Sequence, residues 1–289
     1  MDEFLRQPAQ RQALIAGVPE GRVQLDLDAL RSFDGALADQ LLQAPLEAVP
    51  QWEKSCLQAA QELSEPSITK TFNAIRANGE QPALKIGVSN VRAHRSPPSG
   101  LHAGLLTKLV CVEGIVTRTS VVEPRVLESV HYCEATDRFY RHVFRDNTAL
   151  QGQITSAMYP SKDEDGNLLE TEFGFSKFSD RQRVWVQDLP ERMRAGDIPR
   201  SVQVILDDDL VSTCKAGDRV AIVGIYRALT GRTAKGAVSG VFRQVLLGLA
   251  VRPLAGAGAA VVSDSLAPDQ LTESEIGAFR ALSRRRDLM

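Results

Sequence analysis

The chain has 289 residues, 43% hydrophobic and 24% charged, which fits a globular protein with room for two domains. No apolar run approaches the roughly 18–20 residues that cross a bilayer, and the acidic, polar N-terminus MDEFLRQPAQ is unlike a secretory signal. The formal net charge of −2 excludes a uniformly basic nucleic-acid-binding coat, and four cysteines without a CxxC pair favour a reducing compartment, the cytosol or the nucleus.

Residues 1–83 are predicted to form a helical subdomain, a small bundle. Apolar residues recur there at helical spacing, as in Leu37, Leu41 and Leu42. Short breaks that contain Pro or Gly, at 17–21, 45 and 64–66, divide the region into about four helices.

Residues 84–252 are predicted to form an OB-type barrel, because runs rich in β-branched residues alternate with Gly, Pro and Asp turns. Gly114 lies within one such run, as at a bulge or a barrel corner. The runs RVLESVHYC (125–133) and RFYRHVF (138–144) predict a hairpin, part of an insertion at about 126–180. The strand pattern alone also fits other small barrels and sandwiches. The expected fold class is α+β, with several domains.

The C-terminal residues carry two further expectations. Residues 253–270 are rich in Ala and Gly and are expected to form a linker. Residues 271–289 are expected to start a helix, since Thr272 and Glu275 match a capping box and an apolar stripe follows it.

Charge is distributed unevenly along the chain. Residues 215–252 carry seven basic side chains and one acidic side chain, net +6, whereas residues 146–214 carry seven and thirteen, net −6. Of the 34 basic residues, 26 are Arg, whose planar fork suits phosphate. A bias in genome composition explains the Arg excess equally well.

The basic segment contains a predicted β-hairpin, with strands at 218–229 and 241–251 and the loop TGRTAKGAVSG between them. Arg232 and Lys235 lie in the loop, while Arg227 and Arg243 flank it. A long, thin, basic hairpin can contact a phosphate backbone without reading sequence, although a solvated surface loop carries such charges too. The loop is not a phosphate-binding P-loop, because Ala and Val replace the required Lys and Ser/Thr. No catalytic residues are expected, and no ATPase activity from this chain alone.

Two groups of residues invite a metal-site interpretation. His131, Cys133 and His142 lie on the two arms of a predicted hairpin, as zinc ligands do, but a closed structural site needs four ligands. A core-facing Cys with two surface His is the simpler interpretation, and we expect no zinc. Asp207, Asp208 and Asp209 end a predicted strand and are expected to be solvated turn carboxylates rather than a cation site.

Two stretches resemble the minichromosome maintenance (MCM) proteins, the replicative helicase family. KLVCVEGIVTRTSVVEPRVLESVHYC (108–133) resembles the start of their OB domain, and QDLPERMRAGDIPRSVQVILDDDLVSTCKAGDRVAIVGIY (187–226) resembles the segment after their zinc-hairpin insertion. MYPSKDEDGNLLETEFG (158–174) and the single Cys of SVHYC resemble the third of the six eukaryotic subunits. TESEIGAFRALSRRRDLM (272–289) resembles the helix that enters the AAA+ ATPase domain.

The resemblance implies a helical subdomain, an OB barrel and an inserted degenerate zinc-type β-hairpin subdomain. It implies a nuclear protein that binds single- and double-stranded DNA, assembles with other MCM subunits into a hetero-hexamer, and meets a second hexamer through the N-terminal faces. Such hexamers license and unwind replication origins. An assembly-only module that never touches DNA is the alternative. A free-standing single-strand-binding protein would need stacking aromatics, for which only Trp185, Tyr226 and Phe242 are candidates on barrel strands.

The resemblance also assigns roles to residues. The channel hairpin would span 227–243, with Arg232 and Lys235 nearest its tip. A communication loop would span 189–199. Its marker residues are Leu189, Pro190, Gly196 and Pro199, and the barrel arginines placed to meet single-stranded DNA are Arg118, Arg125 and Arg200.

The chain departs from the family pattern in two respects. Only Cys133 matches the four cysteines of a zinc hairpin, which puts zinc in doubt. The Walker motifs are absent, so ATP and Mg²⁺ would serve the full-length proteins of the family and no cofactor is expected in this chain. The resemblance therefore implies an excised domain, an incomplete gene model or a truncated paralogue.

Overall fold

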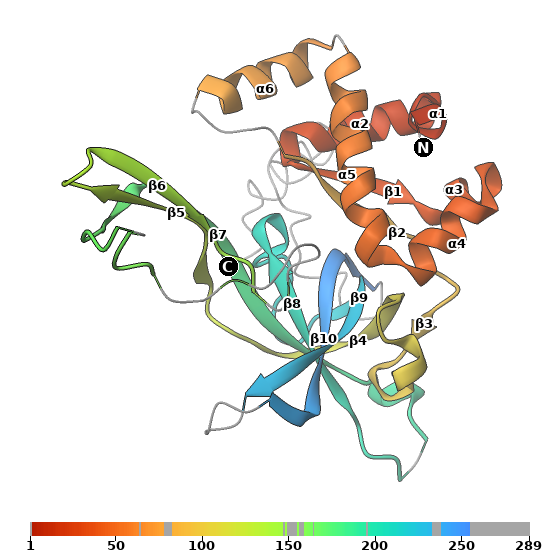
Figure 1. Ribbon diagram of the computed structural model, residues 1–289. Helices are drawn as coiled ribbons and strands as arrows, with labels where there is room; N and C mark the ends of the chain where they lie inside the picture. The colour runs from red at the N-terminus through yellow and green to blue at the C-terminus, as the bar shows by residue number, and fades with distance from the viewer. Residues whose placement is uncertain are drawn as a thin grey trace, which may run out of the picture. The chain divides into compact units, whose positions relative to one another are not determined.

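The computed structural model describes residues 2–63, 65–77, 83–146, 148, 155, 159–163, 165–194, 196–232 and 238–254 (Figure 1). The chain divides into two units, Met1–Pro253 and Leu254–Met289. Nearly all of the predicted linker and the whole predicted terminal helix lie outside the described residues. No helix within the described ranges is long and apolar enough to cross a membrane.

The N-terminal part combines helices with one short parallel sheet. Its helices are α1 (Asp2–Leu5), α2 (Pro8–Glu20), α3 (Leu27–Phe33), α4 (Gly35–Gln43), α5 (Pro45–Glu62) and α6 (Pro66–Ala77). Asp26 and Asp34 cap α3 and α4 by accepting backbone N–H hydrogen bonds at 2.9 Å. Gly21, with φ of 75°, ends α2 in the left-handed conformation that glycine adopts without strain.

The expected bundle of about four helices needs correction, since the region also contains a strand. β1 (Arg22–Asp26) pairs in parallel with β2 (Lys85–Ser89). Val23 and Leu25 are buried while Gln24 between them is exposed, which is the alternation of a half-buried strand. The apolar run 84–88, expected within the barrel region, thus overlaps a strand whose partner belongs to the N-terminal part.

The barrel is closed by five strands, β4 (Leu109–Thr119), β7 (Glu170–Gln187), β8 (Ser201–Asp207), β9 (Arg219–Arg232) and β10 (Val238–Pro253). Their order around the barrel is β4–β7–β8–β10–β9, and β9 pairs back onto β4. The β8–β10 pair is parallel and the other pairs are antiparallel. This is the OB arrangement, as predicted. The barrel core is mainly aliphatic and includes Val112, Val184, Val204, Ile222 and Leu246.

The insertion lies between the first and second barrel strands. β5 (Glu123–Cys133) pairs with β6 (Arg138–Val143) on one side and with the first half of β7 on the other. β5 and β6 form the predicted antiparallel hairpin, and β7 continues from the insertion into the barrel (Figure 1). The zinc-type character of this subdomain stays a prediction.

Candidate nucleic-acid interface

One row of side chains crosses the outer face of the barrel. Arg118 on β4 pairs with Trp185 on β7, and Trp185 pairs with Gln203 on β8. The row continues through Val245 on β10 to Arg227 on β9. Directly paired residues share a face of a sheet, and the residues next to this row on β7 and β8 belong to the barrel core. The row therefore lies on the face opposite the core, with Arg118 exposed at one end and Val245 only 1% exposed in the middle.

A bulge brings Arg118 into this row. Val116 faces the core and Arg118, two residues later on β4, would normally face the same way. The register shifts between these two residues, so Arg118 points outward instead. Its guanidinium carbon lies 4.6 Å from the centre of the Trp185 ring. This cation–π contact places an exposed positive charge beside a half-buried indole.

Gln203 adds an unpaired polar atom beside the indole. The side chain is only 7% exposed, and its Oε1 has no hydrogen-bond partner among the described residues. A buried acceptor without a partner costs free energy, which a ligand donor could recover. The sequence signal for Gln203 is weak, a single polar residue in the apolar run SVQVIL, and it was not singled out.

Some of the arginines that are predicted to contact DNA lie on this face. Arg243 is exposed and pairs with Leu229, so it shares the outer face of the β9–β10 hairpin with the half-buried Arg227. From Arg118 to Arg227 the row crosses four strand spacings, roughly 19 Å around the barrel. Arg232 lies at the end of β9, but its side chain is not described, and Lys235 lies outside the described residues.

Two other predicted arginines lie away from the row. Arg125 is on β5 in the insertion, where its guanidinium lies 3.3 Å from the carboxylate of Asp146 and 3.4 Å from the Thr148 hydroxyl. Much of its charge is therefore balanced within the chain. Arg200 is exposed, and its backbone N–H donates to Asp188 at 2.8 Å. Of the candidate stacking aromatics, Tyr226 is fully buried in the core and Phe242 is 53% exposed.

The predicted communication loop is anchored by two buried carboxylates. Glu113 on β4, 3% exposed, accepts hydrogen bonds from Arg192 in the loop and ion-pairs with Arg95. Burial opposes ionisation of Glu113, but the two arginines outweigh burial and hold its pKa below the ordinary value. Asp188 accepts from the backbone N–H groups of Ser99 and Arg200 at 2.9 and 2.8 Å.

The four marker residues of this loop lie on or near a groove of about 670 Å³. Leu189 is buried and Pro190 begins the short helix η3 (Pro190–Arg192). Gly196 has φ of 94°, a conformation that other residues rarely adopt, and Pro199 is exposed. Arg192, Arg194 and Arg200 line the groove together with Leu189 and Gly196.

Of the three metal candidates, His131 has hydrogen-bond partners on both ring nitrogens, whereas the buried Nε2 of His142 has no hydrogen-bond partner among the described residues. His131 is fully buried, with Nε2 2.6 Å from the Ser129 hydroxyl and Nδ1 3.1 Å from that of Thr171. Burial and the neighbouring His142 lower the pKa of His131. Cys133 is buried as well, and the His142 ring packs edge-on against Phe144. No group of three or more His, Cys, Asp or Glu among the described residues is arranged to hold a metal ion.

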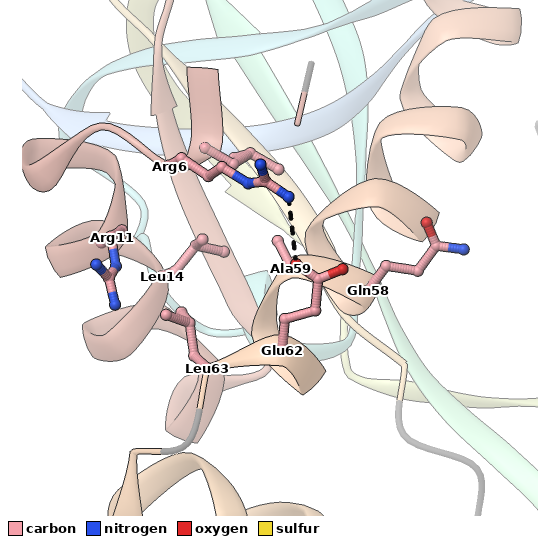
Figure 2. A pocket seen from close by; sticks show the side chains of 8 residues that line it. Arg6, Arg11, Leu14, Gln58, Ala59, Glu62 and Leu63 are labelled. Atoms are coloured by element: carbon pink, nitrogen blue, oxygen red, sulfur yellow. Dashed lines mark ion pairs between the residues drawn. The ribbon is translucent and has the colours of Figure 1, made fainter. Parts of the chain in front are cut away.

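A separate hollow lies in the N-terminal part between α1, α2 and α5 (Figure 2). Leu14 and Leu63 line it, and Arg6 forms an ion pair of 3.8 Å with Glu62 across it. Both charged side chains are more than 70% exposed, so the pair contributes little stability. Neither Arg6 nor the exposed Arg11 belongs to the barrel row.

Comparison with known proteins shows which family the barrel matches. Residues 99–230 match the family model of the MCM OB domain. The chain is 40% identical over 227 residues to the DNA replication licensing factor MCM3 of Oryza sativa subsp. indica, covering 78% of this chain and 28% of that protein. It is 38% identical over 267 residues to MCM3 homolog 1 of Zea mays, covering 92% and 32%, and 52% identical over 150 residues to the maternal mcm3 of Xenopus laevis, covering 52% and 18%. The chain thus spans about a fifth to a third of these relatives.

Proposed function

Because the chain belongs to the MCM family and is similar to MCM3 subunits, we propose that it acts as a DNA-binding, hexamer-forming N-terminal domain. Its work would be the licensing of replication origins in the nucleus, in a ring with other MCM subunits. A second ring would meet it through the N-terminal faces. The relatives' printed names, DNA replication licensing factors, support the process.

The outward row Arg118–Trp185–Gln203–Arg227 carries the DNA-binding proposal. It lies across β7 and β8, the second and third strands of the barrel, which is the face OB folds use for oligonucleotides. Trp185 offers a flat surface for an unpaired base, and Arg118 and Arg227 offer charge for the phosphates on either side.

Such contacts make binding tolerant of sequence and sensitive to salt. Phosphate contacts carry no base information, and each one releases counterions when it forms. One domain binds weakly on these terms. A ring of several subunits raises the effective concentration of each site around the same strand and hence the overall affinity.

Fluorescence anisotropy with a labelled single-stranded oligonucleotide tests the proposal. Trp185→Leu should weaken binding by roughly 5-fold or more, because stacking one base on an aromatic ring contributes about 1–3 kcal/mol. Arg118→Met should weaken binding and reduce its salt dependence. The control is the double variant Arg6→Ala/Arg11→Ala, which removes two exposed arginines from the hollow between α1, α2 and α5 (Figure 2). It should bind the oligonucleotide as tightly as the parent chain does.

The hairpin needs its own variant. Arg232→Ala/Lys235→Ala should weaken binding to single and double strands alike, since these side chains are proposed to contact only the phosphate backbone. Equal affinity at low salt would remove the hairpin from the interface. If Trp185→Leu and Arg118→Met also bind normally, the row is not the DNA site.

An assembly-only module is the alternative, and one observation favours it. The insertion exposes aromatic side chains, with Phe139 59% and Phe175 68% exposed. Their ring centres are 6.1 Å apart, and Tyr132 lies 5.1 Å from Phe139. Exposed apolar clusters mark protein contacts. Binding to other MCM subunits without measurable DNA affinity would establish this alternative.

A further inference from the structure

Three consecutive carboxylates on the barrel contact three different parts of the chain. Asp207, Asp208 and Asp209 lie where β8 ends and the short helix η4 (Asp208–Leu210) begins. We call these three residues the aspartate turn. They are expected to be solvated turn carboxylates. Their side chains are 31–34% exposed, and each also accepts hydrogen bonds from side chains far away in the sequence.

Asp209 binds the N-terminal part through Arg22 of β1. The guanidinium donates from Nε and Nη2 to the two carboxylate oxygens at 2.5 and 2.8 Å, a bidentate pair. Its remaining nitrogen, Nη1, donates to the Ile86 carbonyl on β2 at 3.1 Å and to the Leu249 carbonyl on β10 at 2.8 Å. The Arg22 side chain is 6% exposed and that of Asp209 is 34% exposed, so a nearly buried guanidinium joins β1, β2 and the barrel.

Asp208 accepts hydrogen bonds from side chains of β2 and β7. The ammonium group of Lys85 on β2 donates to one oxygen, and the Ser179 hydroxyl on β7 donates to the other. The third carboxylate, Asp207, forms a bidentate pair with Arg181 on β7 at 2.7 and 2.9 Å. Arg181 also donates to Asp146 of the insertion at 2.6 Å.

The backbone explains why the three carboxylates diverge. Side chains along a strand alternate between two faces, so three in a row on a regular strand would point in only two directions. Asp208 has φ of 55°, the left-handed conformation, which turns the chain between β8 and η4. Asp and Asn tolerate this conformation better than most residues do.

We propose that the aspartate turn is a charged latch that holds the N-terminal part (α1–α6 with β1 and β2) on the barrel, so that breaking it releases this part while the barrel stays folded. The pairs Asp209–Arg22 and Asp208–Lys85 are the only ion pairs that the described residues show between the N-terminal part and the aspartate turn. Removing the Asp209 charge deprives the nearly buried Arg22 of its bidentate partner and leaves only the weaker fields of Asp208 and Glu53, which favours opening of the contact.

Hydrogen–deuterium exchange on the whole chain tests the latch. Asp209→Asn should speed exchange of the β1 and β2 amides by about tenfold or more, while amides of β8 and β9 exchange at the parent rate. Glu123→Gln is the matched control. It breaks the exposed ion pair between Glu123 on β5 and Arg183 on β7 and should leave exchange of β1 and β2 unchanged.

A milder variant guards against loss of folding. Lys85→Met removes the partly exposed partner of Asp208 and should speed exchange of β1 and β2 selectively, by a smaller factor than Asp209→Asn. High salt should narrow the difference between Lys85→Met and the parent chain, because it screens this pair. Two results with Lys85→Met would overturn the proposal. One is an unchanged exchange rate in β1 and β2, and the other is an equal increase in exchange rate throughout the barrel.

Discussion

Gly114 occupies the point on β4 where the barrel closes. It pairs with Val220 on β9, while the next residue, Ile115, already has Gln187 on β7 as a partner. A Cβ on Gly114 would lie 2.3 Å from the Gln187 carbonyl oxygen and 2.5 Å from a Val186 methyl. The sequence prediction of a barrel corner at this glycine therefore has a close backbone approach as its physical reason.

We expect Gly114→Ala to destabilise the protein by about 1–3 kcal/mol, the usual cost of forcing extra atoms into a packed site. Urea unfolding would measure the loss. Gly174→Ala is the control, because a Cβ at Gly174, in the part of β7 that pairs within the insertion, meets nothing within 4 Å. Similar midpoints for Gly114→Ala and the parent would mean that the closure can widen freely.

Polar residues with distant partners were the part of the molecule that sequence could not predict. Arg22 and Asp209 are 187 positions apart, and no local pattern links them. Solvated turn carboxylates were the reasonable interpretation of Asp207, Asp208 and Asp209, since three acids after a strand look the same whether or not cations lie above them. Gln203 was missed for a related reason, because its isolation depends on neighbours from other strands.

At the scale of elements, β7 is a single strand of 18 residues that serves both the insertion and the barrel. Its two arginines Arg181 and Arg183 are two positions apart but differ in burial. Arg181 is 9% exposed and pairs with Asp207 and Asp146, whereas the Arg183 side chain is 44% exposed and pairs with Glu123. Burial of Arg181 disfavours its charge, yet the hydrogen bonds and charge of Asp207, followed by Asp146, raise its pKa overall.

We expect Arg181→Met to destabilise the protein by on the order of 3 kcal/mol, because it leaves the partly buried Asp207 without its cation and Asp146 with only the longer contact to Arg125. Arg183→Met should cost less than about 1 kcal/mol, as exposed ion pairs do. Denaturant midpoints of the two variants, measured side by side, give the comparison. Equal losses would show that burial of the pair is not what decides its contribution.

The strands of the barrel could be predicted because each is a run of β-branched residues with a clear turn at its end, such as SVQVILDD or DRVAIVGIYRAL. β1 was missed because RVQLD is short and lies between two helices, so helical periodicity on both sides hides it. The row of paired side chains on the outer face could not be predicted either. They depend on a register shift at Arg118 and on closure between β4 and β7, neither of which is local.

At the scale of the whole molecule, the acidic and basic segments differ in how freely their charges act. Several carboxylates of the acidic segment 146–214 form ion pairs with Arg or Lys side chains of the same chain. These are Asp146, Asp207, Asp208 and Asp209. On the outer face of the barrel, Arg118 and Arg243 stay exposed. A net charge near zero is therefore compatible with a local basic surface, because these acids neutralise Arg and Lys side chains elsewhere in the chain and not the arginines of the outer face.

The same pairing makes the whole molecule acid-sensitive. Burial disfavours the charged forms of Glu113, Asp146 and Asp208, but their hydrogen bonds and cationic neighbours outweigh it, so all three pKa values lie below the ordinary 4.5 for Glu and 3.8 for Asp. As pH falls, the unfolded chain therefore binds these protons first. The stabilisation is complete above about pH 5 and is lost as pH falls through the lowered pKa values.

Urea midpoints at pH 7, 5, 4 and 3 should therefore stay nearly level down to about pH 5 and then fall steeply. Asp208→Asn removes one of the three carboxylates and keeps a side chain that tolerates the left-handed backbone at φ of 55°. We expect this variant to be less stable than the parent at pH 7 and to approach it as the pH falls, because the parent then loses the charge that the variant lacks. Parallel curves for the two proteins across this range would show that ionised Asp208 does not stabilise the fold.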